Sequence, residues 1–228
     1  MLTEKNILLT LTYLVGLGEL ALAVFFWVTN SKNEIRRVMS LFAFSTGSWC
    51  VFSAMSSYTS ENTLTFFYTN LSYGFAVLAL ASLVHVVLIY PYPLYKLDFR
   101  HLLLYYSLIC VFLVSCFVPG LLIEGFAGND HIVGIITYGP FGVIYNLFLS
   151  ILYIFALGLL FYRKNKLNGQ HKVNANIFLW SIFFGGIPAL ILDLIIPVFF
   201  KGLIPNVLFA NIATSIWLIV TTYIVLKK

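Results

Sequence analysis

Apolar residues along this chain form seven long segments, separated by connectors that are richer in polar residues. The segments cover residues 7–28, 38–58, 64–90, 101–119, 140–162, 175–200 and 203–226, with ends placed to within a few residues. Each segment is long enough to cross a hydrocarbon core of about 30 Å at a helical rise of about 1.5 Å per residue. The pattern therefore predicts an all-α membrane protein, a bundle of seven transmembrane helices in a single domain over residues 1–228.

Glycine and proline mark two departures from this run of straight helices. The sixth segment carries Gly185, Gly186, Pro188 and Pro197, and we expect a kink there because proline removes a backbone donor and presses on the preceding turn. The connector at 121–139 has β-branched and aromatic residues on both sides of a Gly-Asn-Asp turn signal at 128–130. This pattern fits a small β-hairpin between the fourth and fifth helices, and it equally fits an irregular loop.

Basic residues lie almost entirely on one side of the predicted bundle. Eleven of the 13 lysines and arginines follow the odd-numbered segments, whereas Lys5 and Lys201 fall on the opposite side together with four acidic residues. The eleven are Lys32, Arg36, Arg37, Lys96, Arg100, Arg163, Lys164, Lys166, Lys172, Lys227 and Lys228. Cytoplasmic connectors carry an excess of such residues, so we expect the N-terminus outside and the C-terminus in the cytoplasm.

Composition supports a protein whose outer surface faces lipid. Hydrophobic residues make up 61% of the chain and charged residues only 9%, which leaves too little polar surface to cover a soluble globule. The net charge of +5 is accounted for by membrane topology and anionic lipid, so no nucleic-acid partner is expected. The bilayer is the first expected partner, and the length leaves no room for a separate enzyme module.

The sequence lacks the residues that several functions of membrane proteins require. Residues 203–226 contain no lysine for a retinal Schiff base, and the Asp/Glu-Arg-Tyr and Asn-Pro-x-x-Tyr motifs of rhodopsin-like receptors are absent. No paired aspartates, His-Glu-x-x-His motif or credible serine–histidine pair indicates intramembrane hydrolysis. Cys50, Cys110 and Cys116 lie in apolar runs without metal or disulfide spacing. We expect no catalytic residues, no metal and no cofactor.

An ordered set of short motifs extends through nearly the whole chain. Asn33 and Arg36–Arg37 precede the second segment, which carries the run LFAFSTGSW with Phe42, Ser45 and Trp49. The third segment ends in LIYPYP, and a glycine-containing outer loop follows it. The later motifs are GQHK at 169–172, GGIP at 185–188, IP at 196–197, and Tyr223 before the final lysine pair. In this order and spacing the chain resembles the seven-helix N-terminal sensor region of bacterial and archaeal histidine kinases.

This resemblance implies an input module in a prokaryotic inner or plasma membrane that crosses the membrane several times. Its helices would respond to a ligand or to the state of the membrane and bias a cytoplasmic output attached to the last helix. The sequence reaches Lys228 without a dimerisation histidine or an ATP-binding domain. We therefore expect the output to pass through a separate cytoplasmic signalling partner or a homodimer.

Polar residues within the segments are the candidates for a site, because ionisable groups cost about 2.5–3.5 kcal/mol to insert into a bilayer. Glu19 lies near the middle of the first segment, and Asp193 lies about 10 Å from the outer end of the sixth. Four further residues fall at a similar depth in the outer half: Trp49, Asn70, Asn146 and Asn211. If their faces converge, these six residues line an outward-facing pocket for a small-molecule or lipid ligand.

The alternative for each of these residues is a structural hydrogen bond between helices, worth about 0.6 kcal/mol on average. His85 lies near the inner end of the third segment, where packing or a connector contact is the simpler interpretation. A membrane sensor without catalytic activity is the leading functional hypothesis. A small proton- or cation-coupled transporter or channel that uses Glu19 and Asp193 is the first alternative, and a structural subunit of a membrane complex is the second.

Overall fold

A computed structural model describes residues 4–29, 32–59, 61–91, 98–127 and 135–189, together with the single positions 191 and 220. Within these residues the chain forms six helices and one two-stranded sheet. The elements are α1 (Glu4–Thr29), α2 (Glu34–Tyr58), α3 (Asn62–Ile89), α4 (Phe99–Ser115), β1 (Ile123–Ala127), β2 (Ile135–Tyr138), α5 (Gly142–Lys166) and α6 (Gly169–Ala189). The prediction of a mainly helical protein is confirmed.

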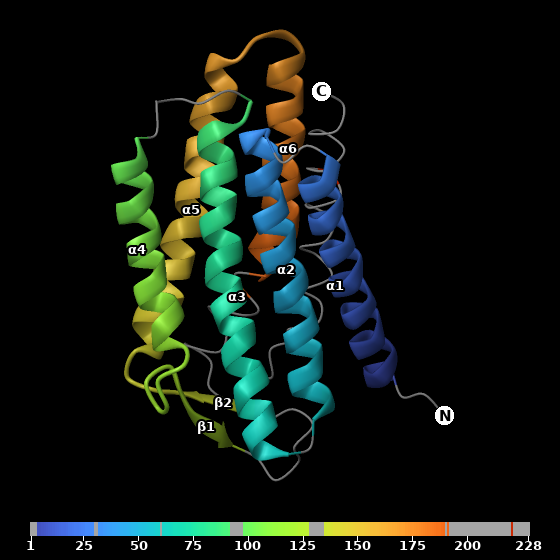
Figure 1. Cartoon of the computed structure of the whole chain (residues 1–228), viewed down its shortest axis with the longest axis vertical. Helices are drawn as coiled ribbons and strands as arrows, with labels where there is room; N and C mark the ends of the chain where they lie inside the picture. Colours follow the sequence, from blue (N-terminus) through green and yellow to red (C-terminus); the bar gives the residue numbers. More distant parts are fainter. Residues whose placement is uncertain are drawn as a thin grey trace.

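The six helices lie side by side along the long axis of the molecule, with the sheet at one end (Figure 1). Successive helices from α1 to α4 alternate in direction, and α3 and α5 both run away from the sheet (Figure 1). Helix α3 is central, since it packs against α2, α4 and α5, while α6 packs on α5 and α1 on α2. Two helices that start at the sheet, α3 and α5, thus run in parallel and in contact through the bundle.

Four of the described helical stretches are long and apolar enough to cross a membrane: Leu9–Thr29, Glu34–Tyr58, Thr63–Ile89 and Gly142–Lys166. They coincide, within a few residues, with the first, second, third and fifth predicted segments. Their outward faces carry large exposed apolar side chains such as Val24 and Ile151, each 64% exposed. Such faces need an apolar surrounding, so the chain associates with membranes through these helices.

The fourth and sixth segments differ from the prediction. The apolar helix Arg100–Ser115 is too short to count among the membrane-crossing helices, because the chain turns after Ser115 towards Pro119 and Gly120, whose φ of +74° suits glycine. Helix α6 begins at Gly169, earlier than residue 175, and its first two turns are polar. Pro188 lies in its last described turn. Residues 190–228, apart from 191 and 220, lie outside the described residues, and with them the seventh predicted helix and Pro197.

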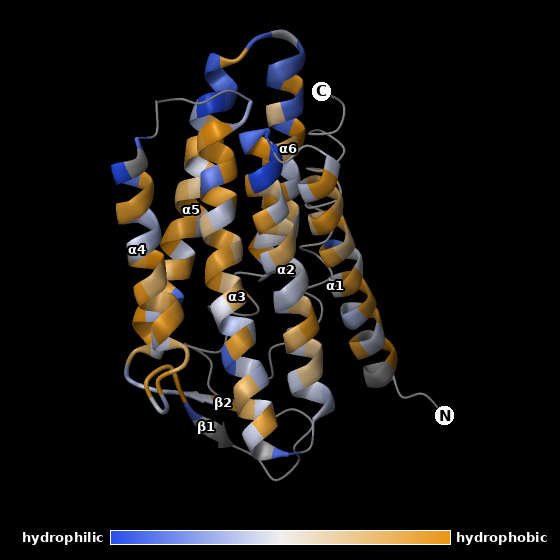
Figure 2. Cartoon of the chain, viewed as in Figure 1, coloured by the Kyte–Doolittle hydropathy of each residue, from blue (hydrophilic) through white to orange (hydrophobic). Residues whose placement is uncertain are grey.

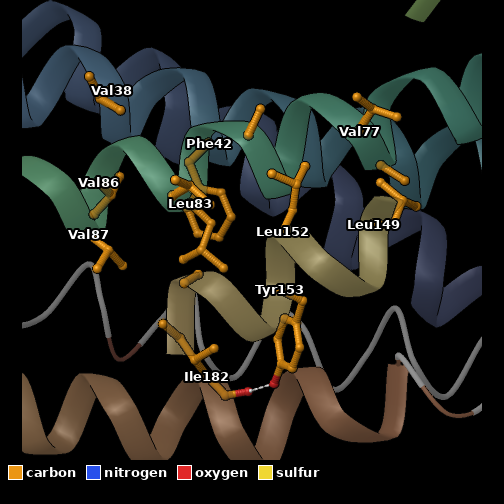
Figure 3. Packing of buried hydrophobic residues seen from close by; sticks show 14 of the residues in the cluster. Val38, Phe42, Val77, Leu83, Val86, Val87, Leu149, Leu152, Tyr153 and Ile182 are labelled. Carbon is orange, nitrogen blue, oxygen red and sulfur yellow. Dashed lines mark hydrogen bonds between the residues drawn. The ribbon is translucent and has the colours of Figure 1, made fainter. Parts of the chain in front are cut away.

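Apolar side chains of all six helices contribute to the core, part of which Figure 3 shows. Phe42 of α2, Leu83 of α3, Leu152 of α5 and Ile182 of α6 belong to one buried cluster. The Tyr153 hydroxyl donates to the backbone oxygen of Ile182 at 2.8 Å, so that a buried polar atom on this apolar face has a partner (Figure 3). This core holds α3 and α5 in register along their length.

The connector between α4 and α5 forms the β-hairpin that its sequence pattern allowed. Strands β1 and β2 pair antiparallel, with Ile123 opposite Tyr138 and Ala127 opposite Ile135. The pairing is irregular between Ile123 and Gly125. The Gly-Asn-Asp turn signal at 128–130 lies outside the described residues.

Described basic residues of three predicted inner connectors gather at the end of the bundle opposite the hairpin, where Figure 2 shows the most hydrophilic helix ends. Arg36 and Arg37 lie in the first turn of α2, Arg100 lies in the first turn of α4, and Lys164 and Lys166 lie in the last turn of α5. Hairpin and basic residues therefore mark opposite ends of the same bundle.

Gly139 fixes the base of the hairpin and gives a first prediction. A Cβ atom at this position would overlap the backbone oxygens of Gly120 and Leu121, which cannot move away as a side chain can. We expect Gly139→Ala to destabilise the hairpin by about 1–3 kcal/mol and to increase hydrogen exchange of its backbone amides. Gly125→Ala is the control, because its Cβ would meet only the Thr137 hydroxyl at 3.5 Å. Equal exchange in both variants would contradict this account.

Candidate functional site

Four of the six predicted site residues lie in the described part of the chain. Glu19 on α1, Asn70 on α3 and Asn146 on α5 are buried, with exposed fractions of 3%, 7% and 3%. Trp49 on α2 is partly buried and packs against the core cluster. Asp193 and Asn211 lie outside the described residues.

Asn70 and Asn146 lie on the faces of α3 and α5 that meet. Asn70 is seven residues before Val77, and Asn146 is three residues before Leu149, so each asparagine shares a helix face with a core residue. Figure 3 shows Val77 and Leu149 in the same packed region between the two helices. Because α3 and α5 run in parallel, the two asparagines lie near the same level, about one helical turn apart along the axis.

Three amide atoms of these asparagines lack hydrogen-bond partners among the residues that the structure describes. Both Oδ1 and Nδ2 of Asn146 are buried and unpartnered, and so is Oδ1 of Asn70. Other buried polar groups nearby are satisfied; the hydroxyls of Ser53 and Ser72, for example, lie 2.7 Å apart across α2 and α3. An unsatisfied buried polar group costs about 1–3 kcal/mol, so unsatisfied amide atoms on two helices that face each other indicate a place for a further polar partner.

Three tyrosines connect the hairpin to the same region. The hydroxyls of Tyr138 on β2 and Tyr73 on α3 lie 2.7 Å apart, and the Tyr145 hydroxyl on α5 donates to the backbone oxygen of Tyr73. The Tyr73 ring lies 6.2 Å from the Tyr138 ring and 5.6 Å from the Tyr145 ring, measured between centroids. Tyr145 directly precedes Asn146, and Tyr73 follows Asn70 by one turn. The hairpin is therefore hydrogen-bonded to α3 through Tyr73, and the same tyrosine is hydrogen-bonded to α5 through Tyr145, beside the asparagine pair.

Glu19 belongs to a different contact, between α1 and α2. Its Oε2 atom lies 3.9 Å from Cys50 Sγ, and Oε1 has no hydrogen-bond partner in the described part of the chain. No hydrogen bond between described residues joins Glu19 to Asn70 or Asn146. The described members of the predicted polar layer thus fall into two places, the asparagine pair between α3 and α5 and the carboxyl group between α1 and α2.

Comparisons with known proteins give no family for this chain. No family model matches it, and no curated protein matches it. Its function is therefore inferred from its own residues.

Two buried polar contacts at the inner end were not predicted as such. Arg163, which the sequence presents only as one of a run of basic connector residues, is 3% exposed and donates from a guanidinium nitrogen to the backbone oxygen of Val87. His85 is also buried, with Nδ1 at 2.8 Å from the Tyr106 hydroxyl of α4, in agreement with the packing interpretation. Nothing in the sequence distinguishes Arg163 from its exposed neighbours, because the distinction depends on which way the last turn of α5 faces.

Proposed function

We propose that the chain is a membrane-embedded sensor module: a seven-helix bundle with its N-terminus outside and its C-terminus in the cytoplasm. It binds a small polar molecule or lipid component between α3 and α5 and carries no catalytic activity of its own. The observation that carries this proposal is Asn146, a buried side chain on a helix long and apolar enough to cross a membrane, with both amide atoms unpartnered among the described residues. The resemblance to the sensor region of histidine kinases supports the same function.

The chemistry of the asparagine pair defines the ligand. An amide offers one acceptor oxygen and one donor nitrogen, so Asn146 suits a group that both donates and accepts hydrogen bonds, such as a hydroxyl or an amide. Neither asparagine carries a charge to balance an ion. The ligand is therefore uncharged where it meets this pair, and the surrounding core favours an apolar body.

The architecture offers a route from this site to the other end of the bundle. Helices α3 and α5 extend from the hairpin to the basic end, where Arg163 of α5 binds the last turn of α3 through Val87. A ligand that changes the separation of the two helices near Asn146 would also change the geometry of the hydrogen bond between Arg163 and Val87 at the inner end. We infer that the basic end is the output side, read by a cytoplasmic signalling protein or a second copy of the chain.

Orientation follows from the same two ends. The basic end faces the cytoplasm by the positive-inside rule, which places the hairpin and the asparagine pair in the outer half of the membrane. The chain would then be a multi-pass protein of a prokaryotic plasma or inner membrane. Cysteine substitution at exposed Glu124 of β1 and at exposed Lys172 of α6, followed by labelling of intact cells with a membrane-impermeant maleimide, tests this orientation. Label at residue 172 but not at 124 would reverse it.

The variant Asn146→Leu separates ligand binding from stability. Leucine has a similar size and no polar atom to leave unsatisfied, so we expect the free energy of unfolding of the ligand-free protein to rise by about 1–2 kcal/mol. The measurement is denaturant unfolding of the purified protein in mild detergent. Asn165→Leu, at an exposed position of the same helix, is the matched control and should change little. A loss of stability in Asn146→Leu would mean that the amide is structural.

Ligand binding is tested by the thermal stability of the wild type and Asn146→Leu in the presence of lipid fractions from native membranes and a panel of uncharged hydroxyl and amide compounds. A ligand that binds only the folded state raises the melting temperature with its concentration. We expect such a rise in the wild type and its absence in the variant. If no compound or fraction raises the melting temperature of the wild type, the proposed ligand site between α3 and α5 is contradicted.

A further inference from the structure

Helices α1 and α2 cross in backbone contact near the middle of α1. A Cβ atom on Gly16 would lie 2.8 Å from the backbone oxygen of Gly47, and one on Gly47 would lie 2.8 Å from the backbone oxygen of Gly16. The same position on Gly47 is 3.0 Å from Cβ of Glu19. Small residues permit such close approach in membranes. Glu19 is therefore held against the α2 backbone at the tightest part of the crossing.

The donors around the Glu19 carboxyl group are too few for a carboxylate. An ionised carboxylate only accepts hydrogen bonds and offers about four sites for them. Here the described donor is the Cys50 thiol, a weak one, at 3.9 Å from Oε2, while Oε1 has none. The backbone N–H groups of α1 and α2 at this level bond within their own helices.

The Thr46 hydroxyl, next to the Glu19 carboxyl group, donates its proton within its own helix. The acceptors are the backbone oxygens of Phe42 at 3.0 Å and Ala43 at 3.2 Å. While this single proton is donated within α2, the hydroxyl faces Glu19 with its lone pairs. A lone pair attracts a carboxyl group that carries a proton and repels a carboxylate.

The charged groups of the packed elements do not compensate Glu19 either. On α2 the charged residues Glu34, Arg36 and Arg37 lie in the first turn, and Arg37 is nine residues, about 13 Å, from Thr46. The Cys50 thiol is the titratable group of α2 that faces the carboxyl group. Within the described residues no cation forms an ion pair with Glu19, so nothing in this part of the chain would balance the buried charge.

We propose that Glu19 is a proton-binding site inside the membrane: a neutral carboxylic acid at neutral pH, with its proton directed to the Thr46 oxygen. Helices α1 and α2 cross around the protonated carboxyl group. Loss of the proton would place a negative charge against the backbone of α2. The proton is thus a second ligand of the chain. The Glu19 site is separate from the asparagine pair, and proton binding there does not depend on the proposed sensor function.

The test is infrared difference spectroscopy of the full-length protein reconstituted in lipid at neutral pH, wild type against Glu19→Gln. The glutamine has the size of the acid without its titration. We expect the wild type to show the carbonyl band of an un-ionised carboxylic acid, sensitive to exchange of H₂O for D₂O, and the variant to lack it. Loss of a carboxylate band instead would overturn the proposal. Asn70→Leu is the control variant and should keep the acid band.

A second measurement needs no substitution. A hydrophobic carbodiimide takes the proton of a buried carboxylic acid on one nitrogen, while the acid oxygen adds to its central carbon; acyl migration then gives a stable N-acylurea, and nothing leaves. We expect peptide mass spectrometry of the wild type to locate the adduct on Glu19, whereas a water-soluble carbodiimide modifies exposed Glu34 and Glu61. Labelling by the hydrophobic reagent at Glu34 and Glu61 without Glu19 counts against a protonated Glu19 even if Glu19→Gln does not fold.

Discussion

Gly16→Leu should lower the free energy of unfolding by about 3 kcal/mol, at the upper end of what overpacking costs. A side chain at this position would begin 2.8 Å from the backbone oxygen of Gly47, 2.8 Å from Cγ2 of Val51 and 3.0 Å from Cβ of Cys50. The backbone oxygen cannot rotate away, so α1 and α2 would have to separate. Separation would also break the 2.7 Å hydrogen bond from the Ser40 hydroxyl to the backbone oxygen of Ala23.

Gly18 provides the control within the same helix. It is exposed, and a Cβ atom there would have no neighbour within 4 Å, so Gly18→Leu should leave stability nearly unchanged. Both variants change helix propensity equally, and their difference therefore reports the crossing alone. Denaturant titration followed by circular dichroism in mild detergent measures both. Two equal midpoints would show that α1 and α2 do not meet at Gly16.

Arg163→Met should lower the free energy of unfolding by about 1.5–3 kcal/mol, the range for a hydrogen bond to a charged group. The guanidinium group is buried and donates to the Val87 oxygen in the last turn of α3, where backbone oxygens have no partner within their own helix. Methionine fills much of the space but donates nothing. The substitution therefore removes the hydrogen bond that joins α3 and α5 at their inner end.

Lys164→Met removes a charge from the same turn of α5 and is the matched control. Lys164 is partly exposed, and its ammonium group lies 5.0 Å from the centre of the Phe161 ring, an interaction worth about 0.5–1 kcal/mol at such sites. Thermal unfolding of the three proteins at matched pH gives the comparison. If Lys164→Met were as destabilising as Arg163→Met, charge at this end rather than the Val87 contact would be responsible.

Hydrophobic length was enough to predict the four helices that are long and apolar enough to cross a membrane. The apolar runs that became α1, α2, α3 and α5 need no tertiary information, because a helix in lipid satisfies its own backbone. The hairpin was predicted as one of two alternatives, since short strands depend on pairing that only the fold decides. The shorter α4 was missed because an apolar run through residue 119 looks continuous, although the chain turns after Ser115.

The candidate site was predictable as a set of residues and not as an arrangement. Asn70 and Asn146 lie within about one helical turn of each other along the axis because α3 and α5 are parallel, which depends on α4 reversing the chain between them. Glu19 faces α2 because Gly16 and Gly47 set the rotation of both helices. Sequence gives depth along a helix from the rise per residue, whereas the direction a side chain faces is decided by its neighbours.

Contacts among the described helices also bear on the order in which the bundle assembles. The most extensive ones join α1 with α2 and α2 with α3, which are consecutive in the chain, whereas α3 meets α5 only after α4 and the hairpin have been made. Contacts close in sequence form quickly, and chains fold from the N-terminus as they are synthesised. We expect the first three helices to pack as a unit during synthesis and to present the α3 face that carries Asn70 to α5 when it arrives.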